Sequence, residues 1–368
     1  MQSCPDDLSL NRTDDKRKEK MVREKKRIVS MDLIRIFSCW CVITCHFNAC
    51  ISGFSNGLFL YPNLVVPSFY LENRVYLGDI GTSLFFILSG ASLMLSYRPG
   101  KLKNYYAKRW LAMYPMFYVA YIVATIADFF IMKGFGGGDL RLLFFSLIGF
   151  DGYLASLGWL GFDFYKLGEW FFGCIVMLYL IFPLLYKGME KKPAITFSMA
   201  CLVYLMYGGW SHSQQVPYVS NYFFLRIPEL LIGMLFVKYN LREKPKVMLG
   251  GACVIAAAAW MLRNYIRPLT LCISICILLF AIMTWIGDYI EQKNVAKILL
   301  ALSGLTFPVY LSHHWMISRL VMGFDLSCMS RRSSWMFYGI FLLFSFVLAY
   351  LLKQLTNYIM ETLKKLRE

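Results

Sequence analysis

The sequence predicts an all-α fold: a polytopic membrane helical bundle of about ten transmembrane helices, with both termini in the cytoplasm. Hydrophobic residues make up 58% of the chain and charged residues only 16%, against about 45–50% and 25% in soluble domains. Too few charges remain to cover a water-facing surface. The net charge of +16 gathers in short stretches between apolar runs, which is typical of cytoplasmic loops rather than of a nucleic-acid-binding surface.

Apolar runs of spanning length supply the predicted helices, since about 20 apolar residues cross a hydrocarbon core of about 30 Å. In chain order they fall at 31–53, 78–97, 111–132, 167–186, 194–210, 222–238, 247–262, 268–286, 298–322 and 335–355. A shorter apolar stretch, 140–148, belongs to an outer loop and is expected to lie in the interface or to re-enter the membrane. The predicted organisation is a basic cytoplasmic tail (1–30), a membrane domain (31–355) and a C-terminal cytoplasmic tail (356–368).

Lysine and arginine residues set the predicted orientation. Of the 38, 27 fall in segments on the side of the two tails, 8 fall on the other side and three lie inside or at the ends of spans. Because basic loops stay in the cytoplasm, both tails are predicted there, in a protein of the plasma (inner) membrane. The densest basic block, 16–27, is expected to lie on anionic lipid headgroups.

The first run carries the sharpest pair of polar residues, Arg35 and His46. Eleven positions at about 100° each bring both to one helix face, about 16 Å apart along the axis. Arg35 is therefore expected at the cytoplasmic edge and His46 near the middle of the membrane. A cation at the rim suits an anionic cytosolic ligand, and a neutral imidazole inside suits proton transfer. The structural alternative is an arginine that reaches the headgroups and a histidine bonded to a neighbouring helix.

The second run opens with an acid and continues with small residues. Asp79 enters from the outer side, where it could pair with His46 or meet a polar substrate. The small residues at 89–92 let a neighbouring backbone approach closely. Packing alone is therefore a sufficient reason for that stretch.

Short motifs spread along the chain resemble those of one family. They combine a basic residue and a histidine in the first span with aromatic, basic and proline-containing segments further on: Arg35 with His46, Leu84–Gly90, Tyr106–Pro115, Gly168–Gly173, Arg226–Met234 and Thr306–His313. In this order they resemble the acyltransferase 3 family of polytopic membrane O-acyltransferases. The resemblance runs from Asp32 to about residue 350, nearly the whole chain.

The resemblance implies transfer of an acyl group, usually acetyl from cytosolic acetyl-CoA, to a hydroxyl of an extracytoplasmic glycan or lipid-linked sugar. It implies His46 as the catalytic imidazole and Arg35 as its partner in recognising the coenzyme. Arg109 takes the first basic position of the family's inner-loop Arg-x-x-Arg motif, but Ala112 stands at the second. Phosphate binding is therefore expected from Arg109 together with nearby lysines: Lys101, Lys103 and Lys108.

An acid that orients His46 is less well defined. Many relatives carry a tandem glutamate in the central helix, where Ile175 and Val176 stand in this chain. Either Asp79 or Glu169 would hold the imidazole and stabilise its cation. Transfer could go directly to the acceptor with His46 as general base, or through an acylated His46. The sequence leaves both routes open.

Two rival interpretations remain. In the other large class of membrane acyltransferases a histidine late in the chain is catalytic, which would assign the reaction to His313 or His314. A transporter or flippase of glycan intermediates also places charges in mid-bundle, but the spans show no recognisable paired broken helices.

The expected partners are acyl-CoA, the sugar acceptor and membrane lipids. No nucleic acid is expected, and no metal either, because the sequence has no Cys and His set at metal-ligand spacing. The outer segments 152–159 and 211–221 carry polar and aromatic residues suited to sugar hydroxyls and faces. The alternative for these aromatic residues is the interfacial belt of a membrane protein.

Overall fold

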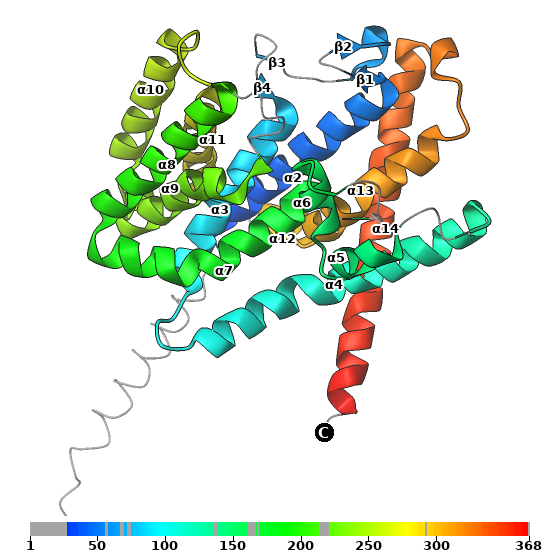
Figure 1. Cartoon of the computed structure of the whole chain (residues 1–368), viewed down its shortest axis with the longest axis horizontal. Helices are drawn as coiled ribbons and strands as arrows, with labels where there is room; N and C mark the ends of the chain where they lie inside the picture. The colour runs from blue at the N-terminus through cyan, green and yellow to red at the C-terminus, as the bar shows by residue number, and fades with distance from the viewer. Residues whose placement is uncertain are drawn as a thin grey trace, which may run out of the picture.

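The computed structural model describes residues 28–55, 58–66, 70–71, 75–134, 139–160, 167, 169–213, 221–290 and 293–366. Within these ranges the protein is a bundle of helices (Figure 1). Two-residue strands form two hairpins: β1 (Phe54–Ser55) pairs with β2 (Leu58–Phe59), and β3 (Tyr70–Leu71) pairs with β4 (Val75–Tyr76). The prediction of an all-α membrane bundle is confirmed.

Each predicted apolar run contains helix. The main helices are α2 (Val29–Ile51), α3 (Leu77–Ser96), α4 (Leu102–Ile131), α7 (Glu169–Lys191), α8 (Pro193–Ser213), α9 (Ile227–Lys238), α10 (Pro245–Met261), α11 (Pro268–Asp288), α12 (Lys293–Ser303), α13 (Thr306–Val321) and α14 (Arg331–Lys365). The outer stretch at 140–148 forms no span. It folds into a 3₁₀ turn and the short helix α5 (Leu143–Leu147), and α6 (Asp151–Ser156) follows.

Fewer helices than the ten predicted are long enough to span a membrane. Among the described residues, seven helices are long and apolar enough to cross a membrane, and α12 with α13, bent by 49°, would make an eighth. α9 has 12 residues and α10 has 17, about 18 and 26 Å at 1.5 Å per residue, short of the core of about 30 Å. α9 is short because residues 223–226 form a 3₁₀ helix and Pro228 stands in its first turn. The count of ten is therefore not confirmed.

The centre of the bundle depends on a close contact between α3 and α9. A Cβ atom at Gly90 would lie 1.9 Å from the carbonyl oxygen of Leu230, and one at Gly233 would lie 1.8 Å from that of Ile87. Both positions therefore require the absence of a side chain. Small residues that let helix backbones touch are a common means of packing in membranes, which is the role expected for the small residues at 89–92.

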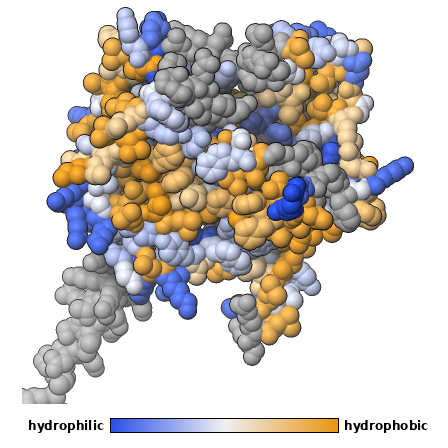
Figure 2. Space-filling model, viewed as in Figure 1, coloured by the Kyte–Doolittle hydropathy of each residue, from blue (hydrophilic) through white to orange (hydrophobic). Residues whose placement is uncertain are grey.

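Helix α2 lies inside this assembly and contacts α3, α11, α12 and α13. Helix α4 crosses the lower part of the bundle in Figure 1 and passes α14. Figure 2 shows apolar residues over much of the visible face, with hydrophilic residues gathered nearer its edges. Large side chains are correspondingly exposed, among them Phe130 at 75% and Leu184 at 72%. Apolar exposure on this scale is typical of a surface that faces lipid.

The chain's last helix is longer than predicted. α14 continues to Lys365, so the segment 356–365, expected as a tail, is helical. Its 35 residues give a length of about 52 Å, well beyond the thickness of the hydrocarbon core. The sequence prediction stopped at 355 because the last turns mix lysines with apolar residues. The helical backbone tolerates that mixture.

Candidate functional site

The most informative contact of the molecule joins α2 to α13. Nδ1 of His46 lies 2.7 Å from Nε2 of His313, a hydrogen-bond distance across 267 residues of sequence. The two rings are stacked, with centroids 5.0 Å apart and planes 9° apart. The other nitrogen of His313, Nδ1, lies 2.6 Å from the backbone oxygen of Tyr310, one helical turn earlier. The residues that the sequence offered as rival catalytic histidines are therefore neighbours.

A third imidazole completes this cluster. His314 meets the ring of His46 edge-on, with centroids 5.4 Å apart. His313 is fully buried, whereas His46 and His314 are half-buried. No group of three His, Cys, Asp or Glu side chains within the described ranges is placed to hold a metal ion.

Arg35 lies at the opposite end of α2 in a compact polar triangle. Its guanidinium donates to Asp32 at 3.1 Å and to the hydroxyl of Ser303 at 2.9 Å, and that hydroxyl donates to Asp32 at 2.7 Å. Ser303 is the last residue of α12, where the chain bends into α13. The Asp32–Arg35 pair is visible in the sequence as an i,i+3 spacing. Ser303 was missed because nothing local marks it.

Arg35 lines a cavity of about 210 Å³. Its wall is mostly aromatic and apolar and carries two arginines: Arg35, Phe85, Leu88, Ser89, Ser92, Leu93, Arg109, Met113, Phe171, Ile175, Tyr179, Thr306, Phe307 and Tyr310. Arg109 lies with its guanidinium 6.0 Å from the ring centre of Tyr179, and its buried Nε lacks a hydrogen-bond partner among the described residues. Tyr310, whose carbonyl oxygen receives His313, is one of the residues that line this cavity.

The other predicted coenzyme-binding residues lie outside that wall. Lys101, Lys103 and Lys108 are exposed at the beginning of α4. The structure therefore brings Arg35 and Arg109 together in one cavity wall from different helices and leaves the three lysines exposed at the beginning of α4.

The two predicted acids are placed differently. The carboxylate of Asp79 accepts a hydrogen bond from the backbone nitrogen of Tyr76 at 3.2 Å and so helps to begin α3. It also lies within electrostatic range of Arg226. Helix α7 begins at Glu169, but the side chain of Glu169 lies outside the described part of the structure. The Nδ1 atom of His46 has its hydrogen-bond contact with His313.

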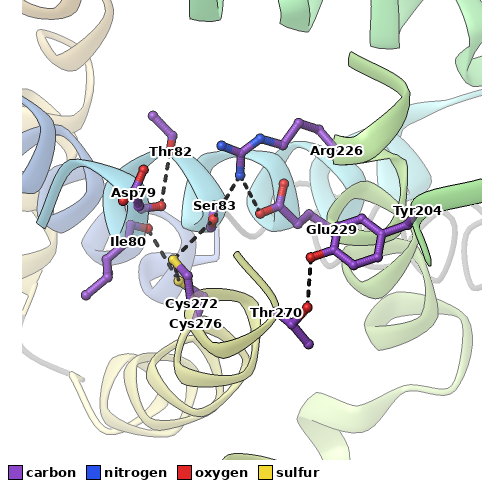
Figure 3. Close-up of polar contacts among 10 residues, drawn as sticks. All are labelled: Asp79, Ile80, Thr82, Ser83, Tyr204, Arg226, Glu229, Thr270, Cys272 and Cys276. Carbon is purple, nitrogen blue, oxygen red and sulfur yellow. Dashed lines mark hydrogen bonds and ion pairs between the residues drawn. The ribbon is translucent and has the colours of Figure 1, made fainter. Parts of the chain in front are cut away.

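Arg226 and Glu229 form a fully buried ion pair beside Asp79. Nη1 of Arg226 donates to Glu229 at 2.9 Å and to the hydroxyl of Ser83 at 3.3 Å, and both charged side chains are 0% exposed. Figure 3 shows Arg226 reaching Ser83 of α3 and Glu229 of α9. The guanidinium is also 5.4 Å from the ring centres of Phe86 and Trp170. The sequence marked both charged residues as part of a motif but gave them no role.

A second buried acid was missed altogether. Asp128 of α4 is 1% exposed and accepts from Nη2 of Arg319 at 2.6 Å, from Nε of Arg319 at 3.0 Å and from the indole of Trp315 at 2.9 Å. Both donors belong to α13, the helix of His313. A lone acid inside an apolar run was the available signal, because such residues rarely face lipid.

The predicted outer segment 152–159 contacts the residues that directly follow the other predicted outer segment, 211–221. The hydroxyl of Tyr153 in α6 accepts from the backbone nitrogen of Phe223 at 3.2 Å, and the ring of Trp159 lies 6.5 Å from that of Tyr222. Burial raises the pKa of Tyr153 to about 12, so its hydroxyl stays protonated. Residues 214–220 of the second loop lie outside the described ranges.

Fold and site together define a class, a multi-pass membrane protein with an imidazole pair beside a basic cavity. A family model described as an acyltransferase domain matches residues 28–354. The chain belongs to the acyltransferase 3 family and is a membrane acyltransferase. Comparison with curated proteins and with solved structures found no match.

Proposed function

We propose that the protein transfers an acetyl group from cytosolic acetyl-CoA to a hydroxyl of a glycan or lipid-linked sugar outside the cell membrane. One observation carries this proposal. A single helix, α2, holds Arg35 at the wall of a basic cavity and, about 16 Å further along its axis, holds His46 in the imidazole cluster. A donor that enters at the arginines would thus point its reactive end along α2 toward His46.

The cavity suits a coenzyme A thioester in charge and in lining. Arg35 and Arg109 offer guanidinium groups to phosphate or carbonyl oxygens. The Nε of Arg109 is buried without a protein partner in the described structure, and an unsatisfied buried donor is costly unless a ligand or water takes it. The aromatic and methionine side chains of the cavity wall suit the uncharged arm of the thioester. Lys101, Lys103 and Lys108 would add attraction for a polyanion at the cavity's cytosolic approach.

Two routes of transfer use the same imidazole. In the direct route, His46 takes the proton of the acceptor hydroxyl as its oxygen bonds to the thioester carbon, and the proton then passes to the departing thiolate. In the relay route, the imidazole nitrogen bonds to the acyl carbon and the thiolate leaves. The acceptor oxygen then takes the acyl group, and its proton goes to the thiolate. Rapid quenching with labelled acetyl-CoA and no acceptor distinguishes them, since only the relay leaves label on the protein.

A transporter of glycan intermediates remains the second candidate, and the bend between α12 and α13 is the observation that favours it. Transporters of that kind pair two broken helices at the midplane. One such bent pair is found among the described residues, whereas that arrangement needs two. At its bend, the hydroxyl of Ser303 contacts Arg35.

The proposal is tested by thioester hydrolysis and transfer with purified protein in detergent. We expect acetyl-CoA to be consumed slowly alone and faster when extracted cell-envelope glycans are added, with label recovered on the glycan. Consumption that no glycan fraction accelerates would contradict the proposed acceptor. Movement of glycan across vesicles without any use of acetyl-CoA would favour the transporter.

A further inference from the structure

We propose that His313 is a positioning residue that fixes the tautomer of His46, so that Nε2 of His46 is the nitrogen presented to the acyl donor and the acceptor. The inference deepens the proposed function and rests on it for the reaction. The tautomer itself follows from contacts within α2 and α13, and it is measurable without turnover.

The backbone of α13 fixes the hydrogen on one nitrogen of His313. Nδ1 of His313 lies 2.6 Å from the carbonyl oxygen of Tyr310. A carbonyl oxygen can only accept a hydrogen bond, so Nδ1 of His313 must carry the hydrogen. His313 is fully buried, and a buried charge is costly, which favours the neutral ring. A neutral imidazole has one N–H, and its Nε2 is therefore an acceptor.

The contact between the two rings then fixes His46. Nε2 of His313 and Nδ1 of His46 are 2.7 Å apart, so one hydrogen must lie between them. Because His313 Nε2 accepts, His46 Nδ1 donates. In the neutral His46 ring the lone pair is then on Nε2, which is the form required of a base or a nucleophile.

The same chain of contacts assists the proton transfer. When Nε2 of His46 takes the proton of the acceptor hydroxyl, the ring becomes a cation. Its Nδ1–H bond to His313 then becomes charge-assisted and stronger, and the Tyr310 carbonyl stabilises the N–H of His313. An imidazole held by a backbone carbonyl thus orients the His46 ring through Nδ1.

Tyr310 also connects this arrangement to the donor. It lines the same cavity as Arg35, and its carbonyl oxygen holds His313. One residue of the cavity wall is therefore also the first residue of the positioning chain.

Variants of His313 test the role by kinetics. We expect His313→Ala to lower kcat by about a hundredfold, within the usual range for loss of positioned acid–base chemistry, with KM for acetyl-CoA changed less than about threefold. His313→Gln keeps an acceptor near the position of Nε2 and should recover at least tenfold of that loss. The matched control is Ile317→Ala, which removes a buried side chain from the same helix, one turn after His313, and takes away no imidazole.

Nitrogen NMR tests the tautomer directly. The chain has four histidines, so ¹⁵N-histidine protein with single His→Gln variants gives assignable ring signals. At alkaline pH we expect His46 and His313 both to be protonated at Nδ1, and His313→Ala to convert His46 to a mixture of tautomers.

These measurements separate the inference from the proposed function. A His46 ring protonated at Nε2 in the native protein, or a His313→Ala variant with native kcat, would overturn the inference. If the native protein shows the expected tautomers but never consumes acetyl-CoA, the proposed reaction fails and the positioning contact stands. If Ile317→Ala loses as much kcat as His313→Ala, the effect belongs to the packing of α13, and the inference is wrong.

Discussion

At the scale of single residues, α2 carries a cation, Arg35, and an imidazole, His46, eleven positions apart. Arg35 is held by Asp32 and Ser303 at a cavity, and His46 is held by His313 in the core. Each side chain is therefore fixed by a partner on another helix or turn. An imidazole in a fixed orientation loses little freedom on reaching a transition state.

We expect His46→Ala to abolish acyl transfer while leaving expression and folding near normal. Loss of the positioned imidazole should lower kcat by a hundredfold or more, and a methyl group is tolerated in a helix. The measurement is acetyl-CoA consumption by variant and native protein at equal amounts of monodisperse material. Turnover retained in the variant would remove His46 from the mechanism and favour His313 or His314.

Donor binding gives a second prediction at this scale. Arg109→Gln should weaken coenzyme A binding by about tenfold, or 1.4 kcal/mol, because Arg109 lines the cavity. Each of Lys101, Lys103 and Lys108 alone should matter less, since all are exposed and exposed charges are screened. A variant in which these three lysines and Arg109 are neutralised together, the quadruple variant, should bind coenzyme A much more weakly than any single variant.

Isothermal titration with coenzyme A measures these affinities. Orientation in the membrane is checked in parallel, because removing four basic residues can change topology. Unchanged affinity in a correctly oriented quadruple variant would show that the donor does not bind at α4.

At the scale of elements, α4 carries both a residue of the cavity wall and an ion-pair partner of α13, the helix of His313. Arg109 lines the cavity, and Asp128 binds Trp315 and Arg319 of α13. The pair Asp128–Arg319 thus fixes α13 against α4. Its loss should loosen the helix that positions His313.

Asp128→Ala should destabilise the protein by about 2 kcal/mol, below the 3–5 kcal/mol typical of a fully buried pair, because Arg319 is 22% exposed. Thermal unfolding in detergent measures this. A matched control is Asp139→Ala, which removes an Asp–Arg pair of the same 2.6 Å length whose arginine is 88% exposed. Equal shifts in melting temperature for the two variants would refute a clamping role.

The α3–α9 contact allows a sharper test of packing. Gly90→Ala places a Cβ 1.9 Å from the Leu230 carbonyl oxygen, so the helices must separate. We expect a loss of at least 2 kcal/mol, as for overpacking of a core, together with a lower folded yield. Gly250→Ala in α10 is the control, since its Cβ meets nothing within 4 Å, and it should be neutral or slightly stabilising. A folded and equally stable Gly90→Ala protein would contradict the close approach.

How far the sequence predicts these elements depends on how local the signal is. The apolar runs are local properties of each helix, and the shared face of Arg35 and His46 is a local property of α2. The sequence predicts both. Three contacts join segments far apart in the chain: His46 with His313, Arg35 with Ser303, and Asp128 with Arg319. Residue spacing along one helix cannot predict such contacts. The bend at Ser303 and the short α9 were missed because an apolar run does not show where its helix breaks.

At the scale of the whole molecule, the proposal requires a donor and an acceptor that never share a compartment. The excess of basic residues on the side of the two tails predicts that this side is cytoplasmic, and the arginine cavity lies at the corresponding end of α2. His46 lies about 16 Å further along the helix, toward the side on which the sequence predicts the outer loops. The protein would therefore pass an acyl group through the membrane rather than act on one face.

Sealed vesicles of known orientation test this claim most directly. Labelled acetyl-CoA is supplied on the cytoplasmic face only, with the glycan acceptor held only on the opposite face, and label on the glycan is measured for native protein and His46→Ala. The account predicts labelled glycan with native protein and none with the variant. Label that appears only when both substrates share the cytoplasmic face would contradict transmembrane transfer and define a one-sided acyltransferase.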